Sequence, residues 1–281
     1  MKIVTDSAAN LSPRQCDEMG VGLVQFRVTF NGKTYVDGTD ITPEEIYRLY
    51  TEYPNEYPMT TLPSAGEFHA MFERYPNEEI IAIHLSSGLS GTFSAAKTAA
   101  DMLPDGRVTV VDSLSIGPAL GWLVEVAAHG ARMGWAKERI LAAVRYVRER
   151  SFTTASFMDI KYLVHSGRVS HLRGIIASML KIKPVIGLDD RDGKFCSLGQ
   201  DISLGRVIRK MVDLTHAKFG RDKIRLQLLH GHNLAGVGKL REAIGAVMDC
   251  AEDPLVTVTS VLGAHAGPTV FGLAAIRTVD F

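Results

Sequence analysis

Short apolar runs and amphipathic stretches alternate along most of this chain. The runs, bounded by Gly, Asn, Asp or Ser, predict buried strands. They lie at Lys2–Thr5, Leu23–Phe30, Lys33–Val36, Glu79–Leu85, Val108–Val111, Thr153–Phe157, Pro184–Leu188, Ile224–Leu229, Val256–Leu262 and Val270–Val279. Apolar positions three or four residues apart predict helices, which lie at Phe93–Leu103, Ile116–Met133, Lys137–Arg150, Asp159–His165, Leu172–Lys181, Leu204–Phe219 and Ala235–Met248. Capping boxes predict two more helices, starting at Thr42 and Ser64.

This alternation is typical of α/β layers in which most strands pair in parallel. The character of the sequence changes near Ser151, so we expect an N-terminal α/β domain over residues 1–150 and a C-terminal α/β domain over residues 151–281. The dipeptide Asn31-Gly32 between two apolar runs predicts a tight hairpin. Ligands of α/β sheets bind beyond the carboxyl ends of the strands, so the residues that follow the strands are the first candidates for a site.

The segment Ser86–Thr92, with sequence Ser-Ser-Gly-Leu-Ser-Gly-Thr, joins a buried strand to a helix. Such a turn presents hydroxyls and backbone N–H groups at the start of the helix, where the dipole also favours negative charge. Gly88 lets a ligand approach the backbone closely. Ser87 and Ser90 are therefore candidate ligands of an anion, although serines at such positions also serve as helix caps.

Composition narrows the class of protein. The chain has 281 residues, equal numbers of acidic and basic side chains and three widely spaced cysteines. A formal net charge of zero disfavours nucleic acid as a partner. No apolar run approaches the roughly 20 residues that span a bilayer, so we expect no stable membrane insertion. The cysteine pattern and the absence of an apolar leader favour the cytoplasm.

Two further clusters join small residues to one basic side chain each. Gly263–Thr269 interrupts two apolar runs and contains His265, which either lies on a surface turn or lines a cleft as a hydrogen-bond donor. Ser166–Ser170 contains Arg168, which is either a surface charge or a fork that binds an anion.

Signatures of several enzyme classes are missing. Gly88–Thr92 resembles a nucleophile elbow, but a threonine replaces its last glycine. An acyl hydrolase with Ser87 or Ser90 as nucleophile and His265 as base remains an alternative, as does a binder of a small phosphorylated ligand, although few cations flank these turns. His230-Gly231-His232 lacks the other residues of a metal site. We expect no catalytic residue, no metal and no cofactor.

Taken together, these clusters resemble the DegV family of bacterial fatty-acid-binding proteins. The matching stretches appear in the family's order over nearly the whole chain, and Ser86–Thr92 is the most specific. The others are Lys2–Ala8, Thr60–Ser64, Val111–Ser113, Leu163–Ser170, Ile182–Pro184 and Gly263–Pro268. The resemblance implies two α/β domains, a mainly parallel sheet in the first and a mixed sheet in the second, with a long-chain fatty acid between them.

By resemblance, the carboxylate of the fatty acid is surrounded by Thr60 and Thr61, the Ser87–Ser90 turn and His265, with Arg168 near the mouth of the site. The chain is then a carrier and not an enzyme. It would present the acid to a separate fatty acid kinase, whose acyl-phosphate product feeds phospholipid synthesis. Two positions depart from the family pattern: Leu62 replaces a common glutamine, and Thr269 replaces a repeated glycine. The apolar faces of Leu172–Leu180, Val261-Leu262 and Phe271–Ile276 either line a slot for the tail or pack in the core.

Overall fold

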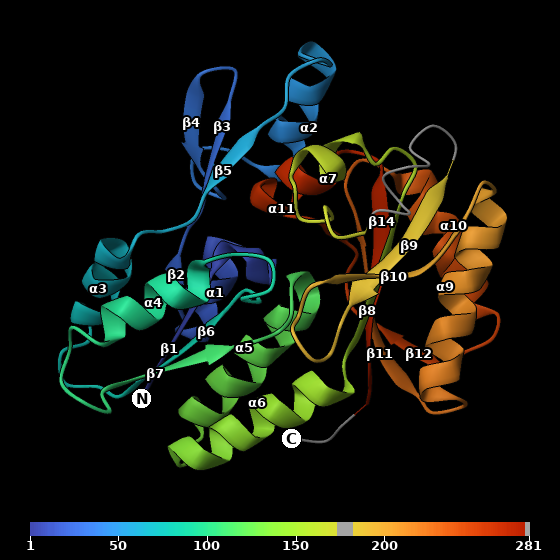
Figure 1. The fold of residues 1–281 in the computed structure, drawn as a ribbon. Helices are drawn as coiled ribbons and strands as arrows, with labels where there is room; N and C mark the ends of the chain where they lie inside the picture. Colours follow the sequence, from blue (N-terminus) through green and yellow to red (C-terminus); the bar gives the residue numbers. More distant parts are fainter. Residues whose placement is uncertain (173–181, 279–281) are drawn as a thin grey trace. The chain divides into compact units, whose positions relative to one another are not determined.

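The computed structural model describes residues 1–172 and 182–278 (Figure 1). The chain divides into two units. Unit 1 comprises Met1–Thr42, Thr60–Glu149 and Asp190–Lys194, and unit 2 comprises Pro43–Met59, Arg150–Asp189 and Phe195–Phe281. A single cut at residue 150 differs from this division at two places, because Pro43–Met59 joins the C-terminal unit and Asp190–Lys194 joins the N-terminal one.

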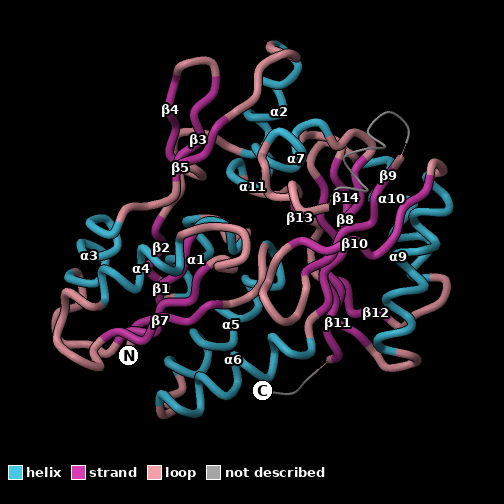
Figure 2. Tube along the Cα trace, in the orientation of Figure 1, coloured by secondary structure: helices cyan, strands magenta, loops and turns pink. Residues whose placement is uncertain are grey.

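Unit 1 is built on a parallel sheet, as the alternation of strands and helices predicts. Its described strands are β1 (Lys2–Asp6), β2 (Gly22–Val24), β6 (Ile80–His84) and β7 (Val108–Asp112), in the order β2-β1-β6-β7 (Figure 2). The helical segments are η1 (Ser7–Ala9), α1 (Pro13–Met19), α3 (Ala65–Glu73), α4 (Thr92–Ala100), α5 (Gly117–Arg132) and α6 (Lys137–Arg150). Phe68 and Phe72 of α3 pack with β1, β6 and α4 in a buried core.

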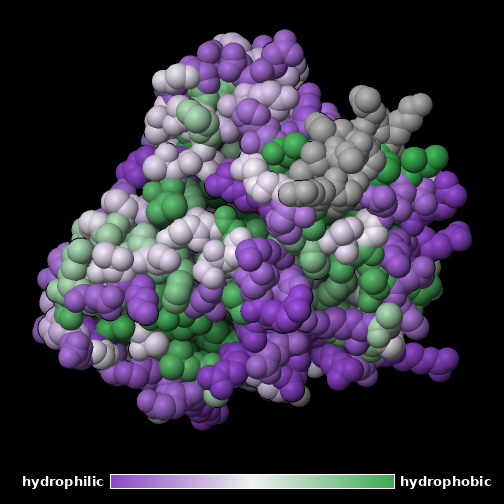
Figure 3. Space-filling model, viewed as in Figure 1, coloured by the Kyte–Doolittle hydropathy of each residue, from purple (hydrophilic) through white to green (hydrophobic). Residues whose placement is uncertain are grey.

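A second, small sheet contains β3 (Arg27–Phe30), β4 (Lys33–Val36) and β5 (Met59–Thr61), in the order β4-β3-β5. The predicted hairpin is confirmed, since Asn31 and Gly32 adopt φ values of 47° and 74° between β3 and β4. Hydrophilic residues prevail over its tip (Figure 3). The predicted strand Leu23–Phe30 is wrong as one element: the N–H of Phe26 donates to Ser7 Oγ, and the chain passes here from the parallel sheet to the small one.

Unit 2 is built on a mixed sheet, also as expected. Its described strands are β8 (Phe152–Phe157), β9 (Lys183–Leu188), β10 (Phe195–Asp201), β11 (Ile224–His230), β12 (Cys250–Glu252), β13 (Val256–Thr257) and β14 (Val270–Arg277). The order is β10-β9-β8-β14-β11-β12, and β13 also pairs with β11. Only β12 and β13 of these run parallel to their neighbour. The described helices are α2 (Pro43–Glu52), α7 (Lys161–His165), α9 (Leu204–Phe219), α10 (Leu234–Gly245) and α11 (Ser260–Ala266).

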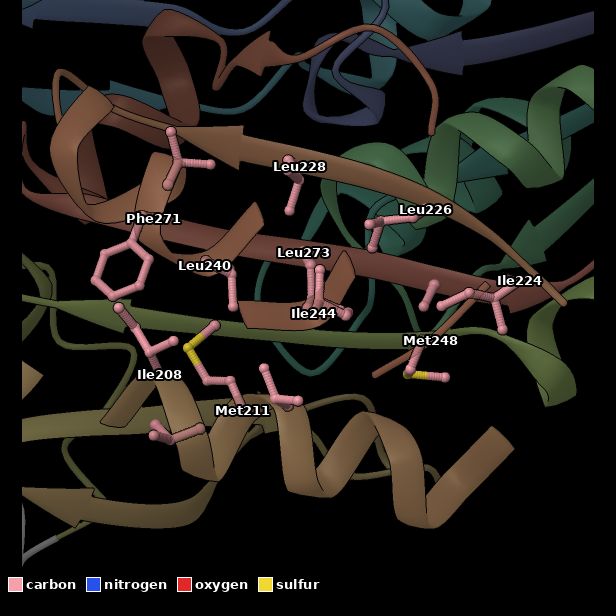
Figure 4. Packing of buried hydrophobic residues seen from close by; sticks show 14 of the residues in the cluster. Ile208, Met211, Ile224, Leu226, Leu228, Leu240, Ile244, Met248, Phe271 and Leu273 are labelled. Atoms are coloured by element: carbon pink, nitrogen blue, oxygen red, sulfur yellow. The ribbon is translucent and has the colours of Figure 1, made fainter. Parts of the chain in front are cut away.

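The core of unit 2 lies between this sheet and the helices α9 and α10 (Figure 4). Phe271 and Leu273 of β14 meet Ile208 and Met211 of α9 there. Of the apolar residues considered for a tail slot, Phe271, Leu273 and Ala275 therefore belong to the core, because alternate side chains of a strand share one face. The predicted helix Leu172–Lys181, with the tail-slot candidates on it, falls on residues 173–181, outside the described residues.

The prediction of a strand over Val256–Leu262 is wrong beyond Thr257, because helix α11 begins at Ser260. Val258 and Val261 favour a strand by local propensity. The helix instead buries Ser260, Val261, Gly263 and Ala264 on one side and contacts α2 and α7. Tertiary packing thus overrides the local preference, and His265 lies on a helix and not in a tight turn.

Candidate functional site

The segment Ser86–Thr92 forms the predicted turn between β6 and α4. Ser86 is fully buried, and its hydroxyl donates to the carbonyl of Gly193 at 2.9 Å and accepts from the N–H of Gly88 at 3.2 Å. The carbonyl of Ser86 accepts from the N–H groups of Leu89 and Ser90, at 3.0 and 3.2 Å. One serine therefore fixes the turn, in which Ser87 is exposed and Ser90 is half-buried.

The turn offers a ligand its hydroxyl groups, because its own backbone amides are already hydrogen-bonded within the protein. The N–H of Ser87 donates to Asp112 Oδ1 at 3.1 Å, so the amides of residues 87–90 are all used within the protein. The exposed hydroxyl of Ser87 has no hydrogen-bond partner among the described residues, and Ser90 Oγ lies 2.8 Å from Thr92 Oγ1. The N-cap residue of helix α4 is Gly91, which has no side chain to cap the first-turn amides.

The loop Asp190–Lys194 packs directly against this turn. A Cβ atom on Gly88 would lie 2.3 Å from the carbonyl oxygen of Asp192, and one on Gly193 would lie 2.0 Å from Ser86 Oγ. Gly193 also has a φ of +64°, which favours glycine. From the sequence, Asp190–Gly193 is only a polar turn after a predicted strand, and no motif links it to a serine more than 100 residues earlier.

Beneath the turn, Asp6 joins the ends of β1 and β6. Its Oδ2 atom accepts from the N–H of Leu85 at 2.9 Å and lies 3.0 Å from Nδ1 of His84, while Oδ1 accepts from the N–H of Ala8. Asp6 and His84 are both fully buried. Asp6 thus caps the segment after β1 and links the ends of β1 and β6.

Thr60 and Thr61 end strand β5, and the residue that follows them meets the turn. A Cβ atom on Gly91 would lie 3.4 Å from Cδ2 of Leu62. Thr60 is half-buried and Thr61 is exposed. Unit 1 therefore brings the segment that carries the two threonines beside the segment that carries Ser90. Leu62 supplies an apolar contact at that point.

Arg168 and His265 are the predicted site residues of unit 2. Helix α7 leads into a turn at Gly167, with a φ of +77°, and Arg168 Nη1 donates back to the carbonyl of Ser166 at 2.6 Å. Burial lowers the pKa of Arg168. His265 lies on α11, which contacts α7. Burial first, and then the charge of Arg168, lower the pKa of His265 to about 3. The imidazole is therefore neutral at pH 7, with one N–H to donate.

The predicted residues thus fall into two sets: Thr60, Thr61, Ser87, Gly88 and Ser90 in unit 1, and Arg168 and His265 in unit 2.

Within residues 1–172 and 182–278, no three His, Cys, Asp or Glu side chains gather as metal ligands would. His230 Nδ1 lies 2.7 Å from the carbonyl oxygen of Gly231. None of the helices in those same ranges is both long and apolar enough to cross a bilayer.

Comparisons with known proteins cover the whole length of the chain. The family model described as "Uncharacterised protein, DegV family" matches residues 1–278. A DegV domain-containing protein of Listeria innocua is 33% identical over 279 residues, 96% of each chain, and one of Staphylococcus aureus is 30% identical over 280 residues, 98% of each. The solved structure of a DegV family protein from Thermus thermophilus, described as binding fatty acid, superposes with a TM-score of 0.89 at 27% identity over 99% of each chain.

The motifs that the sequence analysis singled out lie within the matched residues, from Asp6 at the end of β1 to His265 on α11. The family match and the matches to the Listeria and Staphylococcus relatives run through both α/β units of the structure. The chain belongs to the DegV family.

Proposed function

We propose that this protein binds one long-chain fatty acid non-covalently and does not itself transform it. The observation that carries the proposal is the turn Ser86–Thr92, which offers hydroxyls and an uncapped helix start but no cationic side chain. The Thermus relative, 27% identical over 99% of both chains, is described as binding fatty acid and supports the same ligand class.

In this proposal the hydroxyls of Thr60, Thr61, Ser87 and Ser90 and the first amides of α4 hold the carboxylate. Gly88 supports this arrangement indirectly, because the absence of a side chain lets the loop Asp190–Lys194 pack against the turn. Hydroxyl and amide donors suffice for a carboxylate, because hydrogen bonds to an ionised acceptor are roughly twice as strong as neutral ones. A phosphorylated ligand would be served better by clustered lysines or arginines.

His265 and Arg168 complete the proposed set of ligands. A neutral imidazole donates one hydrogen bond to a carboxylate without burying a full positive charge. The lowered pKa of His265 therefore suits the head group of a free acid. Arg168, whose guanidinium already donates to the carbonyl of Ser166, retains further N–H groups for an anion or for a partner protein.

The tail supplies most of the affinity. Burying about fifteen methylenes at about 0.8 kcal/mol each gives roughly 12 kcal/mol before costs. Association and ordering cost about 4 kcal/mol or more. The head group then decides the orientation of the acid. We further propose that the protein presents the bound acid to a separate fatty acid kinase and so acts as a carrier in acyl-phosphate formation.

The test is native mass spectrometry of the protein purified from bacteria, followed by organic extraction, delipidation and reloading with labelled palmitate or oleate. The proposal predicts a one-to-one complex that releases intact acid. A protein that emerges empty and fails to take up either acid contradicts it. A covalent acyl-serine would indicate an acyl hydrolase. A bound nucleotide or sugar phosphate would indicate a binder of small phosphorylated ligands.

The kinase step needs its own experiment. Loaded protein, a fatty acid kinase and ATP should give acyl-phosphate, whereas the protein with ATP alone should give none. Arg168→Ala should reduce acyl-phosphate formation more than it weakens binding of the acid. Esterase turnover by the isolated chain that is lost in Ser87→Ala or Ser90→Ala would contradict the carrier role.

A further inference from the structure

Helix α2 lies far from His265 in sequence but packs against the helix that carries it. Residues 43–59 cluster with unit 2, and α2 contacts α11 (Figure 1). The buried face of α2 consists of Ile46, Tyr47 and Tyr50. The hydroxyl of Tyr50 lies 3.1 Å from the carbonyl oxygens of both Gly263 and Ala264. The second of these carbonyls directly precedes His265.

The Tyr50 hydroxyl supplies a hydrogen-bond donor that is missing at the C-terminal end of α11. The last carbonyls of a helix lack partners within it. Gly267 donates its N–H to the carbonyl of Gly263 at 2.8 Å, but the residue four positions after Ala264 is Pro268, which has no N–H. The side chain of Tyr50 supplies the donor. Burial raises the pKa of this tyrosine, so its O–H stays protonated throughout the working pH range.

Two tyrosine side chains pack against glycines of α11, one within the helix and one at its C-cap. A Cβ atom on Gly263 would lie 2.6 Å from Tyr47 Oη, and one on Gly267 would lie 2.2 Å from Cδ2 of Tyr162. Tyr162 belongs to α7, the helix that leads to Arg168, and its ring centre lies 4.4 Å from that of Tyr50. Tyr50 therefore contacts both α11, which carries His265, and α7, which leads to Arg168.

We propose that Tyr50 is a positioning residue for His265: its hydroxyl fixes the end of α11, and its ring packs against Tyr162 of α7, the helix that leads to Arg168. Helix α2, which interrupts unit 1 in the sequence, then supports the proposed ligand-binding residues of unit 2. The inference deepens the proposed function, on which its affinity test rests.

The decisive variant is Tyr50→Phe, which keeps the ring against Tyr162 and removes only the donor. The matched control is Tyr57→Phe. The Tyr57 ring lies 5.6 Å from that of Tyr162, and its hydroxyl has no hydrogen bond among the described residues. Gly263→Ala is a second variant, which disturbs the contact between α2 and α11 from the other side and keeps the test available if Tyr50→Phe folds poorly.

Two readouts are needed. In the ligand-free protein, ¹⁵N-histidine NMR should show that the His265 nitrogens shift and that their titration midpoint rises in Tyr50→Phe; His265→Asn assigns the signal. In calorimetry with oleate, the Kd should increase about threefold to tenfold. Tyr57→Phe should match the wild type in both measurements, and Gly263→Ala should follow Tyr50→Phe.

An unchanged His265 spectrum or an unchanged Kd in Tyr50→Phe overturns the inference, even if the melting temperature falls, because the hydroxyl then serves stability alone. Equal effects in Tyr57→Phe also overturn it. The NMR experiment needs no ligand. If wild-type protein failed to bind oleate, the proposed function would fail while the positioning of His265 by Tyr50 would still be decided.

Discussion

Thr269 Oγ1 bonds to both backbone polar groups of Asp159: it accepts from the N–H at 3.0 Å and donates to the carbonyl at 3.2 Å. Asp159 Oδ1 in turn accepts from the N–H of Lys161 at the start of α7. One hydroxyl thus joins the loop that follows α11 to the loop that precedes α7.

Replacing Thr269 should reveal this link as a loss of stability. Thr269→Val keeps the shape but leaves the N–H of Asp159 without its acceptor, and we expect a loss of about 1–2 kcal/mol in the free energy of unfolding. Thr269→Ser keeps the hydroxyl and should lose less. Urea denaturation of the two variants decides the matter, and equal stabilities would show that the hydrogen bonds contribute nothing.

Removal of single head-group hydroxyls should weaken fatty-acid binding. For Thr61→Ala and Ser87→Ala we expect a loss of about 1.5–3 kcal/mol in binding free energy if each donates to the carboxylate, with no change in melting temperature. The double variant that retains wild-type affinity would exclude this end of unit 1 as the carboxylate site. Calorimetry with a thermal-melt control measures both quantities.

Ser90 should behave differently from Ser87. Its hydroxyl pairs with that of Thr92, which is fully buried, so Ser90→Ala removes a partner from a buried group. We expect a loss of about 1 kcal/mol or more in folding stability in addition to weaker binding. A Ser90→Ala protein as stable as Ser87→Ala would show that the Thr92 hydroxyl finds another hydrogen-bond partner.

The close approach of Gly193 to Ser86 predicts a large penalty for alanine. Gly193→Ala combines a positive φ with a Cβ contact of 2.0 Å, whereas Gly106 has a φ of +77° and nothing within 4 Å. We expect Gly106→Ala to lose about 1–2 kcal/mol and Gly193→Ala to lose about 1–3 kcal/mol more. The difference in urea-denaturation midpoints measures the contact alone. Equal losses would mean that the loop moves away from Ser86 without cost.

The pH dependence of stability should report the lowered pKa of His265. An unfolded histidine titrates near pH 6.5 and the folded one near pH 3, so between these values the unfolded chain binds a proton that the folded chain does not. Stability therefore falls as the pH is lowered through this window, by at most about 1.4 kcal/mol per pH unit from this residue. His230, whose pKa burial also lowers, adds a slope of the same sign.

The variant His265→Asn isolates the contribution of His265. Its denaturation free energy, measured from pH 7 to pH 5, should fall less steeply than that of the wild type, while the contribution of His230 stays in both proteins. Parallel curves would show that His265 titrates normally in the folded state.

Local patterns could predict much of this molecule from its sequence. Ser64 begins a helix through a capping box, and Asn31-Gly32 makes a hairpin. The buried runs form strands. Each of these features depends on residues within a few positions. The Ser86–Thr92 turn belongs with them, since its shape follows from hydroxyls and glycines in one short segment.

What the sequence did not reveal depends on contacts between distant segments. Gly193 is a turn residue by every local criterion, yet its carbonyl accepts from Ser86. Val258 and Val261 suggest a strand, but burial of α11 against α2 makes the later valine helical. The pairing of Tyr50 with Ala264 leaves no periodic signal, because a single tyrosine on an amphipathic helix is compatible with ordinary core packing.

The division into units bears on how such a gene can be cut and recombined. The chain passes from one unit to the other five times, at residues 42/43, 59/60, 149/150, 189/190 and 194/195. A fragment ending at residue 150 would contain unit 1 without the loop Asp190–Lys194, which covers Ser86. It would also contain helix α2 without α11, against which α2 packs. Exchange of halves between homologues would separate contacting segments at both places. The two units are therefore expected to be inherited together as one genetic module.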